Sequence, residues 1–397
     1  MPENSFEISL TLFQLGATVF CANLLLLNRN HRALFLPLAL FFVAESIVGA
    51  IDLLIEFAGS DQLTRRDLLW IGLAASASVF EPFLFWSYVK VLTSENGVEK
   101  LRPRGLHYLP FVLAVLTLVS VLSLPNVLFG TADVDIESLN LLQILPLLFL
   151  ELLDFFFQIM VLIYLWLIVN QLRTYTNRLK DLFATTEDRE LLWVWWIAFV
   201  VGIYLVLGMV GTLASFFDLE NSIHPIFDSD HANSLASFAI VWVIALWGLR
   251  QQPGLIREQP TFDAIAEKEE AAGPKYERSA LTEDRAKRIA SKIERAMSND
   301  LVYRDPNLSL WDLAKHIGVT SAYVSQTLNT TIGSNFFDYI NSWRVRDAVE
   351  QLQNSDETIL VITYDVGFNS RSSFYKAFKR EMGTTPSELR TKLRAQS

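Results

Sequence analysis

The sequence of 397 residues contains a single cysteine, Cys21, and only five histidines. An internal disulfide is therefore excluded, and so is a metal site built from several thiolates. Cys21 lies in an apolar run, where we expect a small core residue. The one segment that gathers histidine and aspartate, 224–231, has no spacing typical of a metal site, so we expect neither a metal nor a cofactor. Nor does the sequence contain a phosphate-binding loop or a recognisable nucleophile and base pair, so we do not expect an enzyme.

Apolar residues are abundant and unevenly distributed. They make up 51% of the chain, the mean hydropathy is +0.30, and almost all long apolar runs precede Arg250. Residues 282–397 carry 16 Lys and Arg against 14 Asp and Glu, a net charge of +2, whereas residues 1–281 carry 17 against 29, a net charge of −12. Only the C-terminal part therefore has a charge balance compatible with phosphate contacts. The pattern predicts a membrane domain over 1–250, a linker over 251–281 and a soluble domain over 282–397.

Seven apolar stretches are long enough for membrane helices, which need roughly 20 residues. The N-terminus has no basic leader, so we expect the first stretch to remain as a span. The seven expected spans are Phe6 to Leu27, Ala33 to Ala58, Leu68 to Leu92, Leu106 to Phe129, Leu141 to Val169, Leu191 to Phe217 and Leu235 to Leu249.

Basic residues are almost missing from alternate loops. With the N-terminus outside, the outer loops contain only Arg65 and Arg66, and the other two outer connections contain no Lys or Arg. The inner side then holds Arg29, Arg32, Lys90, Lys100, Arg102, Arg104, Arg173, Arg178, Lys180, Arg189 and Arg250. By the positive-inside rule, the protein is expected in a membrane with its C-terminal domain in the cytoplasm.

Carboxylates interrupt the apolar spans. Glu151 and Asp154 share a helix face, and with Glu81 they are candidates for a ligand or proton site. The alternative is that they are buried and protonated, paired across helices, or closer to the interface. Three further carboxylates lie in the same runs, at Glu45, Asp52 and Glu56.

The segment 251–281 has three prolines, two glycines and mixed charge, and nothing that could form a core. We expect a tether, partly helical over 262–272, with a flexible reach of roughly 30 Å.

Residues 309–329 have the spacing of a helix-turn-helix. Ala314 is small where two helices would cross, Gly318 can adopt a turn conformation, and Val324 would bury the second helix against the first. The second helix then presents Ala322, Ser325 and Gln326 to bases, with Asn329 expected at a phosphate.

A second copy follows over 358–380. Gly367 turns the chain, and Phe374 and Phe378 are expected to pack inward. The outward residues Arg371, Ser372, Tyr375 and Lys376 are expected to contact bases, and Lys379 and Arg380 to contact phosphates. A connecting helix over 336–352, whose Arg344 is expected at a phosphate, would hold the two units apart. One chain would then read two major-groove segments about 34 Å apart.

Residues 309–390 resemble the DNA-binding domain of the AraC/XylS family of bacterial transcription regulators. The resemblance is carried by VGFNS at 366–370, SSFYKAFKR at 372–380 and MGTTPSELR at 382–390. It implies that the helices beginning at Ser321 and Arg371 recognise DNA. Two residues depart from the family pattern: Thr363 stands where Ala is usual, and Gln326 where Arg is common. The seven-span half resembles, more distantly, the membrane sensors attached to some members of the family.

The expected fold is therefore all-α, with a seven-helix transmembrane bundle followed by a two-unit DNA-binding domain. The expected function is a membrane-anchored transcription regulator that receives a signal through its bundle. Expected partners are double-stranded DNA and the lipid bilayer, with RNA polymerase, a small-molecule or lipid signal and a second copy of the chain as further candidates. A seven-helix transporter or intramembrane enzyme with a regulatory C-terminal domain is the first alternative. A receptor whose C-terminal domain binds protein is the second.

Overall fold

The computed structural model describes residues 5–27, 32–58, 64–94, 105–124, 141–187, 189–216, 230–251, 255 and 282–396. Within these ranges every regular element is a helix, and the one β-type pairing is an isolated bridge between Phe183 and Ser309. The all-α expectation is confirmed for this part of the chain. The expected tether, apart from Gln251 and Leu255, and the segment 224–229 lie outside the described residues.

The chain forms two compact units. Unit 1 comprises Met1–Arg173 with Leu191–Ile256, and unit 2 comprises Thr174–Glu190 with Arg257–Ser397. The sequence predicted one domain over 1–250, whereas the contacts group Thr174–Glu190 with the C-terminal residues.

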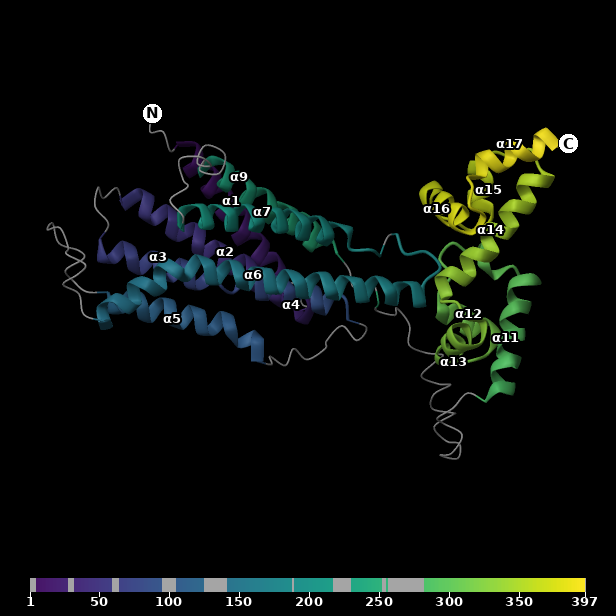
Figure 1. The fold of residues 1–397 in the computed structure, drawn as a ribbon, viewed down its shortest axis with the longest axis horizontal. Coiled ribbons are helices and arrows are strands. Elements are labelled where there is room, and N and C mark those ends of the chain that lie inside the picture. Colours follow the sequence, from purple (N-terminus) through teal and green to yellow (C-terminus); the bar gives the residue numbers. More distant parts are fainter. Residues whose placement is uncertain are drawn as a thin grey trace. The chain divides into compact units, whose positions relative to one another are not determined.

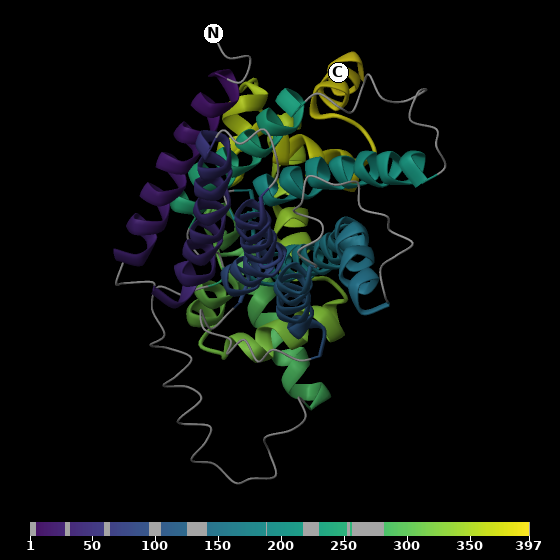
Figure 2. The ribbon, with the colours of Figure 1, turned by 90° about the vertical axis from the view of Figure 1, so that its left-hand side faces the viewer.

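Unit 1 is a bundle of apolar helices (Figures 1 and 2). α1 packs against α2 and α9, α2 packs against α3 and α4, α3 packs against α5, and α7 packs against α9. The helices are α1 (Ser5–Leu27), α2 (Arg32–Ala58), α3 (Arg65–Ser78), α4 (Glu81–Leu92), α5 (Leu109–Ser123), α6 (Leu141–Leu182), α7 (Leu192–Phe216) and α9 (Asp230–Arg250), with a short 3₁₀ turn η1 (Gly105–Tyr108) before α5.

Large apolar side chains lie on the outer faces of these helices as well as inside. Phe20 is 64% exposed and Trp196 is 67% exposed. Helices that are apolar all round need an apolar environment on their outer faces, as a bilayer provides.

Five described helical segments are long and apolar enough to cross a membrane, and two further apolar helices, Leu109–Ser123 and Leu235–Arg250, are shorter. The expected third span consists of α3 and α4, which meet at Val79 and Phe80, just before Pro82 in the first turn of α4. Proline is favourable there because its missing N–H would have no partner in the first turn. The expected fifth span ends at Val169, but α6 continues to Leu182 and contains 42 residues. At 1.5 Å per residue α6 is roughly 63 Å long, about twice what a hydrocarbon core needs.

Polar side chains inside unit 1 bond across helices. The Tyr88 hydroxyl donates to the Gly248 carbonyl oxygen at 3.1 Å, and Gln171 Nε2 donates to Thr93 Oγ1 at 2.8 Å. Such bonds fix helix pairs in surroundings where a buried polar group has no water to bind.

Unit 2 contains seven helices and two short helical turns C-terminal to residue 281, among the residues described there (Figure 1). α11 begins after Thr282 and buries Ile289, Ile293 and Met297, as its spacing predicts. The elements are α11 (Glu283–Ser298), η4 (Val302–Arg304), α12 (Leu310–Ile317), α13 (Ser321–Thr327), the π-helical turn η5 (Leu328–Ile332), α14 (Phe336–Asn354), α15 (Ile359–Asp365), α16 (Arg371–Met382) and α17 (Pro386–Gln396).

Two hydrophobic clusters underlie these elements. The first gathers residues of α11, α12, α13 and η5 around Leu313, Val324 and Leu328, which are fully buried. The second gathers residues of α14, α15 and α16 around Phe374 and Phe378, which are also fully buried. α14 contributes to both clusters and therefore connects them.

Candidate nucleic-acid interface and helix-bundle cavity

The first helix-turn-helix is formed by α12 and α13. Ala314 is fully buried at the crossing, and Gly318 ends α12 with a φ of 66°, a conformation that favours glycine. The Ser309 hydroxyl accepts from the Asp312 N–H, and the Asp312 carboxylate accepts from the Ser309 N–H. This reciprocal cap fixes the start of α12, and the sequence S-x-x-D at 309–312 could have revealed it.

The outer face of α13 carries the residues expected to contact bases. Ala322 and Gln326 are exposed and Ser325 is half-buried, while Val324 between them is fully buried. Asn329, in η5, is exposed, with its amide 3.5 Å from the Ser325 hydroxyl. This face offers hydroxyl and amide groups but no cation.

The second helix-turn-helix is formed by α15 and α16. Gly367 has a φ of 95°, and a Cβ there would lie 2.7 Å from the carbonyl oxygens of Tyr303 and Arg304. Ser370 caps α16 by accepting from the Ser373 N–H. The Thr363 hydroxyl, at the position where the resembled family usually has Ala, donates to the Ile359 carbonyl oxygen at 2.7 Å, so the buried polar group is satisfied within its own helix.

The outer face of α16 is basic and hydrogen-bonding. Arg371, Ser372, Lys376 and Lys379 are exposed, and Tyr375 is half-buried. The Arg371 guanidinium lies 5.0 Å from the centre of the Tyr375 ring and donates to its hydroxyl at 3.3 Å. Partial burial would raise the pKa of Tyr375, but hydrogen bonds with Ser387 and Arg371 and the Arg371 charge outweigh it and lower that pKa. Arg371 and Tyr375 therefore form one polar group.

Arg380 is exposed but already has anionic partners. Its Nη1 lies 2.6 Å from Asp338 Oδ1 on α14, and its Nη2 lies 3.3 Å from Glu381 Oε1. A phosphate would have to compete with these carboxylates, whereas no described ion pair involves Lys379.

The prediction that Arg344 contacts a phosphate is wrong for this conformation. Arg344 is fully buried, and it donates to the carbonyl oxygens of Tyr303 at 2.7 Å and Asp305 at 2.8 Å. Burial lowers the pKa of Arg344 to about 10, so it is still charged at neutral pH. Its role is structural: it holds the chain around η4 against α14.

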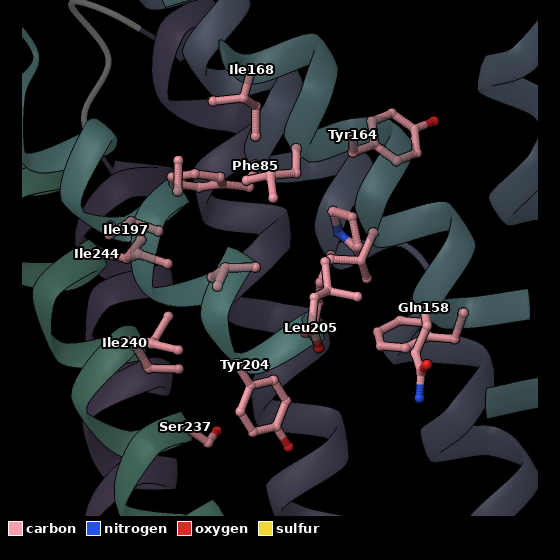
Figure 3. A pocket seen from close by; sticks show the side chains of 18 of the residues that line it. Phe85, Gln158, Tyr164, Ile168, Ile197, Tyr204, Leu205, Ser237, Ile240 and Ile244 are labelled. Atoms are coloured by element: carbon pink, nitrogen blue, oxygen red, sulfur yellow. The ribbon is translucent and has the colours of Figure 1, made fainter. Parts of the chain in front are cut away.

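Unit 1 contains a cavity of about 500 Å³ between α2, α4, α6, α7 and α9 (Figure 3). Most of its wall is apolar, with Phe85, Leu205 and Ile244 among the labelled side chains, and Gln158 and Tyr204 add polar groups. The predicted candidates Glu81 and Asp154 line it together with Glu45, but Glu151 is not among the residues that line it. Lys, Arg and His are absent from the described lining. The cavity therefore combines an apolar wall with acceptors.

Comparison with known proteins gives matches that each cover less than a third of the chain. Residues 313–392 match a family described as a helix-turn-helix domain. The chain is 33% identical over 92 residues to a putative AraC-like transcription regulator of Streptomyces lividans, a match that covers 22% of this chain and 30% of that protein. It is 30% identical over 112 residues to an uncharacterized HTH-type transcriptional regulator of Staphylococcus aureus strain COL, covering 28% of this chain and 14% of that protein.

Among solved structures, the C-terminal domain of AraT, a response regulator from Geobacillus stearothermophilus, matches 26% of this chain and 84% of that chain, with 23% identity and a TM-score of 0.24. The aligned regions span less than a third of the two curated relatives. The family and curated matches support DNA-binding transcription regulation by an AraC-type helix-turn-helix domain in the C-terminal part of the chain.

Proposed function

We propose that the protein is a membrane-anchored, sequence-specific transcription regulator, in which unit 2 reads two major-groove segments and unit 1 senses a signal. The observation that carries the proposal is the pair of helices α13 and α16, each packed on a buried core with a polar outer face. Base contacts come from Ala322, Ser325 and Gln326 on α13 and from Arg371, Ser372, Tyr375 and Lys376 on α16. Asn329 and Lys379, with Arg380 if it leaves its carboxylate partners, contact phosphates.

The test uses the full chain in lipid nanodiscs and genomic DNA fragments selected by the wild type. We expect Arg371→Ala and Lys376→Ala each to weaken binding to these fragments by about 1–3 kcal/mol, because each variant loses its contact with a base. The control is Lys287→Ala, since Lys287 is exposed on α11, is not on either recognition helix, and pairs with Glu283 at 2.7 Å. Binding of the wild type that does not depend on DNA sequence would contradict the proposal. Unchanged binding by both α16 variants would instead favour a C-terminal domain that binds protein.

The membrane anchoring is supported by the apolar outer faces of unit 1 and by the distribution of Lys and Arg. We propose seven spans in the bacterial cytoplasmic membrane, the N-terminus outside and unit 2 inside. A phosphatase fused to the C-terminus should be inactive and a cytoplasmic fluorescent reporter active. The opposite pair of results would place unit 2 away from the chromosome and overturn the proposal.

The sensing role is supported by the cavity in unit 1. The wall is apolar, it contains carboxylates, and its described lining has no Lys, Arg or His. Such a cavity suits a lipophilic molecule that carries a hydrogen-bond donor or a positive charge. Leu205→Trp, which would fill the cavity, should abolish the response of a reporter gene to its inducing condition while leaving DNA binding intact. The control is Val206→Trp, since Val206 is exposed on the same helix and is not among the residues that line the cavity.

The alternative of a transporter or intramembrane enzyme makes a different prediction. Asp154→Asn would then abolish a flux or turnover in vesicles that contain the protein, with no effect on transcription.

A further inference from the structure

A short segment that follows α6, Phe183–Thr186, is built into unit 2. The Ala184 N–H donates to the Leu308 carbonyl oxygen at 3.1 Å, and Phe183 forms an isolated antiparallel bridge with Ser309. The Thr185 hydroxyl donates to the Pro306 carbonyl oxygen at 2.9 Å. The segment therefore pairs with the chain that leads into α12 as a minimal β-ladder would.

The side chains of this segment are buried in the same place. Ala184 is 1% exposed and belongs to the hydrophobic cluster that contains Leu313 and Val324. Phe183 is 6% exposed and meets the Trp311 ring edge-on, with 5.6 Å between ring centres. Trp311 is half-buried, and Phe183 covers part of it, which the sequence did not predict.

A second set of bonds holds the segment from the side of α6. The Arg189 guanidinium lies 4.0 Å from the centre of the Phe183 ring. The Tyr175 hydroxyl, on α6, donates to the Arg189 carbonyl oxygen at 2.8 Å. The Thr186 hydroxyl donates to Glu190 at 2.7 Å. The chain after α6 is thus folded back on the helix end and presents Phe183 and Ala184 to α12.

The contacts lead to both helix-turn-helix units. Ser309, which faces Phe183, is the cap of α12, and α12 packs against α13. The Ala184 carbonyl oxygen accepts from Arg344 Nη1 at 3.4 Å and from Asn341 Nδ2 at 3.4 Å, both on α14. Arg344 also bonds to the chain around η4. Gly367, in the turn of the second helix-turn-helix, packs against the same chain. One four-residue segment therefore meets the elements that set both recognition helices.

We infer that Phe183–Thr186 is an internal docking segment that completes the core of the DNA-binding unit and couples it to the membrane half through α6. This inference rests on the proposed function. α6 lines the cavity of unit 1 with seven residues from Asp154 to Ile168, and it continues without a break to Leu182. The docking segment leaves Ala322, Gln326, Arg371 and Lys376 exposed, so the docked state is the one that binds DNA. Undocking weakens the first helix-turn-helix.

α6 provides a second connection between the two units, besides the linker. The segment 251–281 joins the units covalently, but α6 reaches unit 2 as a helix that ends in buried contacts. A helix transmits a shift of its own residues better than a tether does, because a tether absorbs it.

The test uses the full chain in nanodiscs and measures amide hydrogen exchange in α12, α13 and α16, which reports local opening. Ala184→Asp would place a carboxylate in the cluster around Leu313. We expect at least tenfold faster exchange in α12 and α13, a smaller change in α16, and at least tenfold weaker binding to a genomic fragment selected by the wild type. Glu187→Ala is the control, since Glu187 is exposed two residues beyond Thr185, and it should change neither quantity by more than twofold.

Thr185→Val provides the second variant, because it keeps the shape of the side chain and removes the bond to Pro306 and the acceptor of a 3.4 Å bond from Arg344 Nη1. It should increase amide exchange in α12 about threefold. If Ala184→Asp does not accumulate in cells, Thr185→Val alone tests whether the docking segment stabilises α12. Exchange in α12 equal to the wild type in the interpretable variants would overturn the inference. Failure of the wild type to bind any genomic fragment would instead refute the proposed function, and the exchange data would still report whether the segment is docked.

Discussion

Arg344 Nε donates to the Tyr303 carbonyl oxygen at 2.7 Å, across a sequence separation of 41 residues. The bond joins the middle of α14 to η4, the point where the two hydrophobic clusters of unit 2 meet. A charged side chain here is fully buried and holds the two helix-turn-helix units together.

Removal of Arg344 should destabilise unit 2. Arg344→Met fills a similar volume but leaves the carbonyl oxygens of Tyr303 and Asp305 without their donors, at about 1–3 kcal/mol for each buried acceptor. We expect the free energy of unfolding to fall by about 3 kcal/mol or more, measured by pulse proteolysis of the full chain in detergent. Arg346→Met is the matched control on the same helix, because Arg346 is exposed and its guanidinium lies 5.4 Å from the centre of the Trp343 ring. It should cost less than about 1 kcal/mol.

The turn of the second helix-turn-helix should not tolerate a side chain. Gly367→Ala combines a positive φ, at about 1–2 kcal/mol, with a Cβ that would lie 2.7 Å from two main-chain oxygens. Gly383→Ala has a similar φ of 70° but no atom within 4 Å of the added Cβ. Gly383→Ala should therefore cost only the first of these amounts, and Gly367→Ala should cost clearly more in the same proteolysis assay. Equal losses would mean that the backbone around η4 shifts to accommodate the Cβ at position 367 without a loss of stability.

Lys379 should contribute to affinity through charge alone. Each phosphate contact releases counterions, so Lys379→Ala should reduce the slope of log K against log salt concentration by about 0.9 and weaken binding to all sequences alike. Ser372→Ala is expected to leave the slope unchanged and to relax the preference at one base pair. Filter binding of the full chain between 50 and 200 mM salt, values suited to this dependence, separates the two effects.

The start of α17 should be sensitive to acid. The Glu388 carboxylate accepts from the Thr384 hydroxyl at 2.7 Å and from the Thr385 N–H at 3.1 Å, and these bonds lower the pKa of Glu388 below its ordinary value of 4.5. Since the folded pKa is depressed, the stabilisation is present above the unfolded pKa and is lost as pH falls through the folded pKa. Hydrogen exchange in α17 should therefore rise more in the wild type than in Glu388→Gln when the pH falls below 4.5, after correction for intrinsic rates. An identical pH dependence in the two proteins would contradict this role of Glu388.

The sequence by itself determined the helices and which of them are apolar. Apolar runs longer than a hydrocarbon core predict helices such as α2 and α7, and the spacing of Ile289, Ile293 and Met297 predicts α11. These patterns are local, because the residues of one helix face recur every three or four positions along the chain. The turn glycines Gly318 and Gly367 were predictable for the same reason.

The tertiary structure decided what each cation and each connection does. The charge of Arg344 indicated an exposed phosphate contact, but carbonyl oxygens from Ala184, Tyr303 and Asp305 surround it instead. Nothing in the residues near Arg344 encodes these acceptors, since they come from segments 39 to 160 residues away. The same holds for Phe183 and Ala184. In the sequence they lie between the fifth and sixth expected spans, whereas in the structure they are buried in unit 2. Burial of a polar or loop residue depends on partners that are brought together only when the chain folds, because a sequence pattern specifies the face of a helix but not its neighbour.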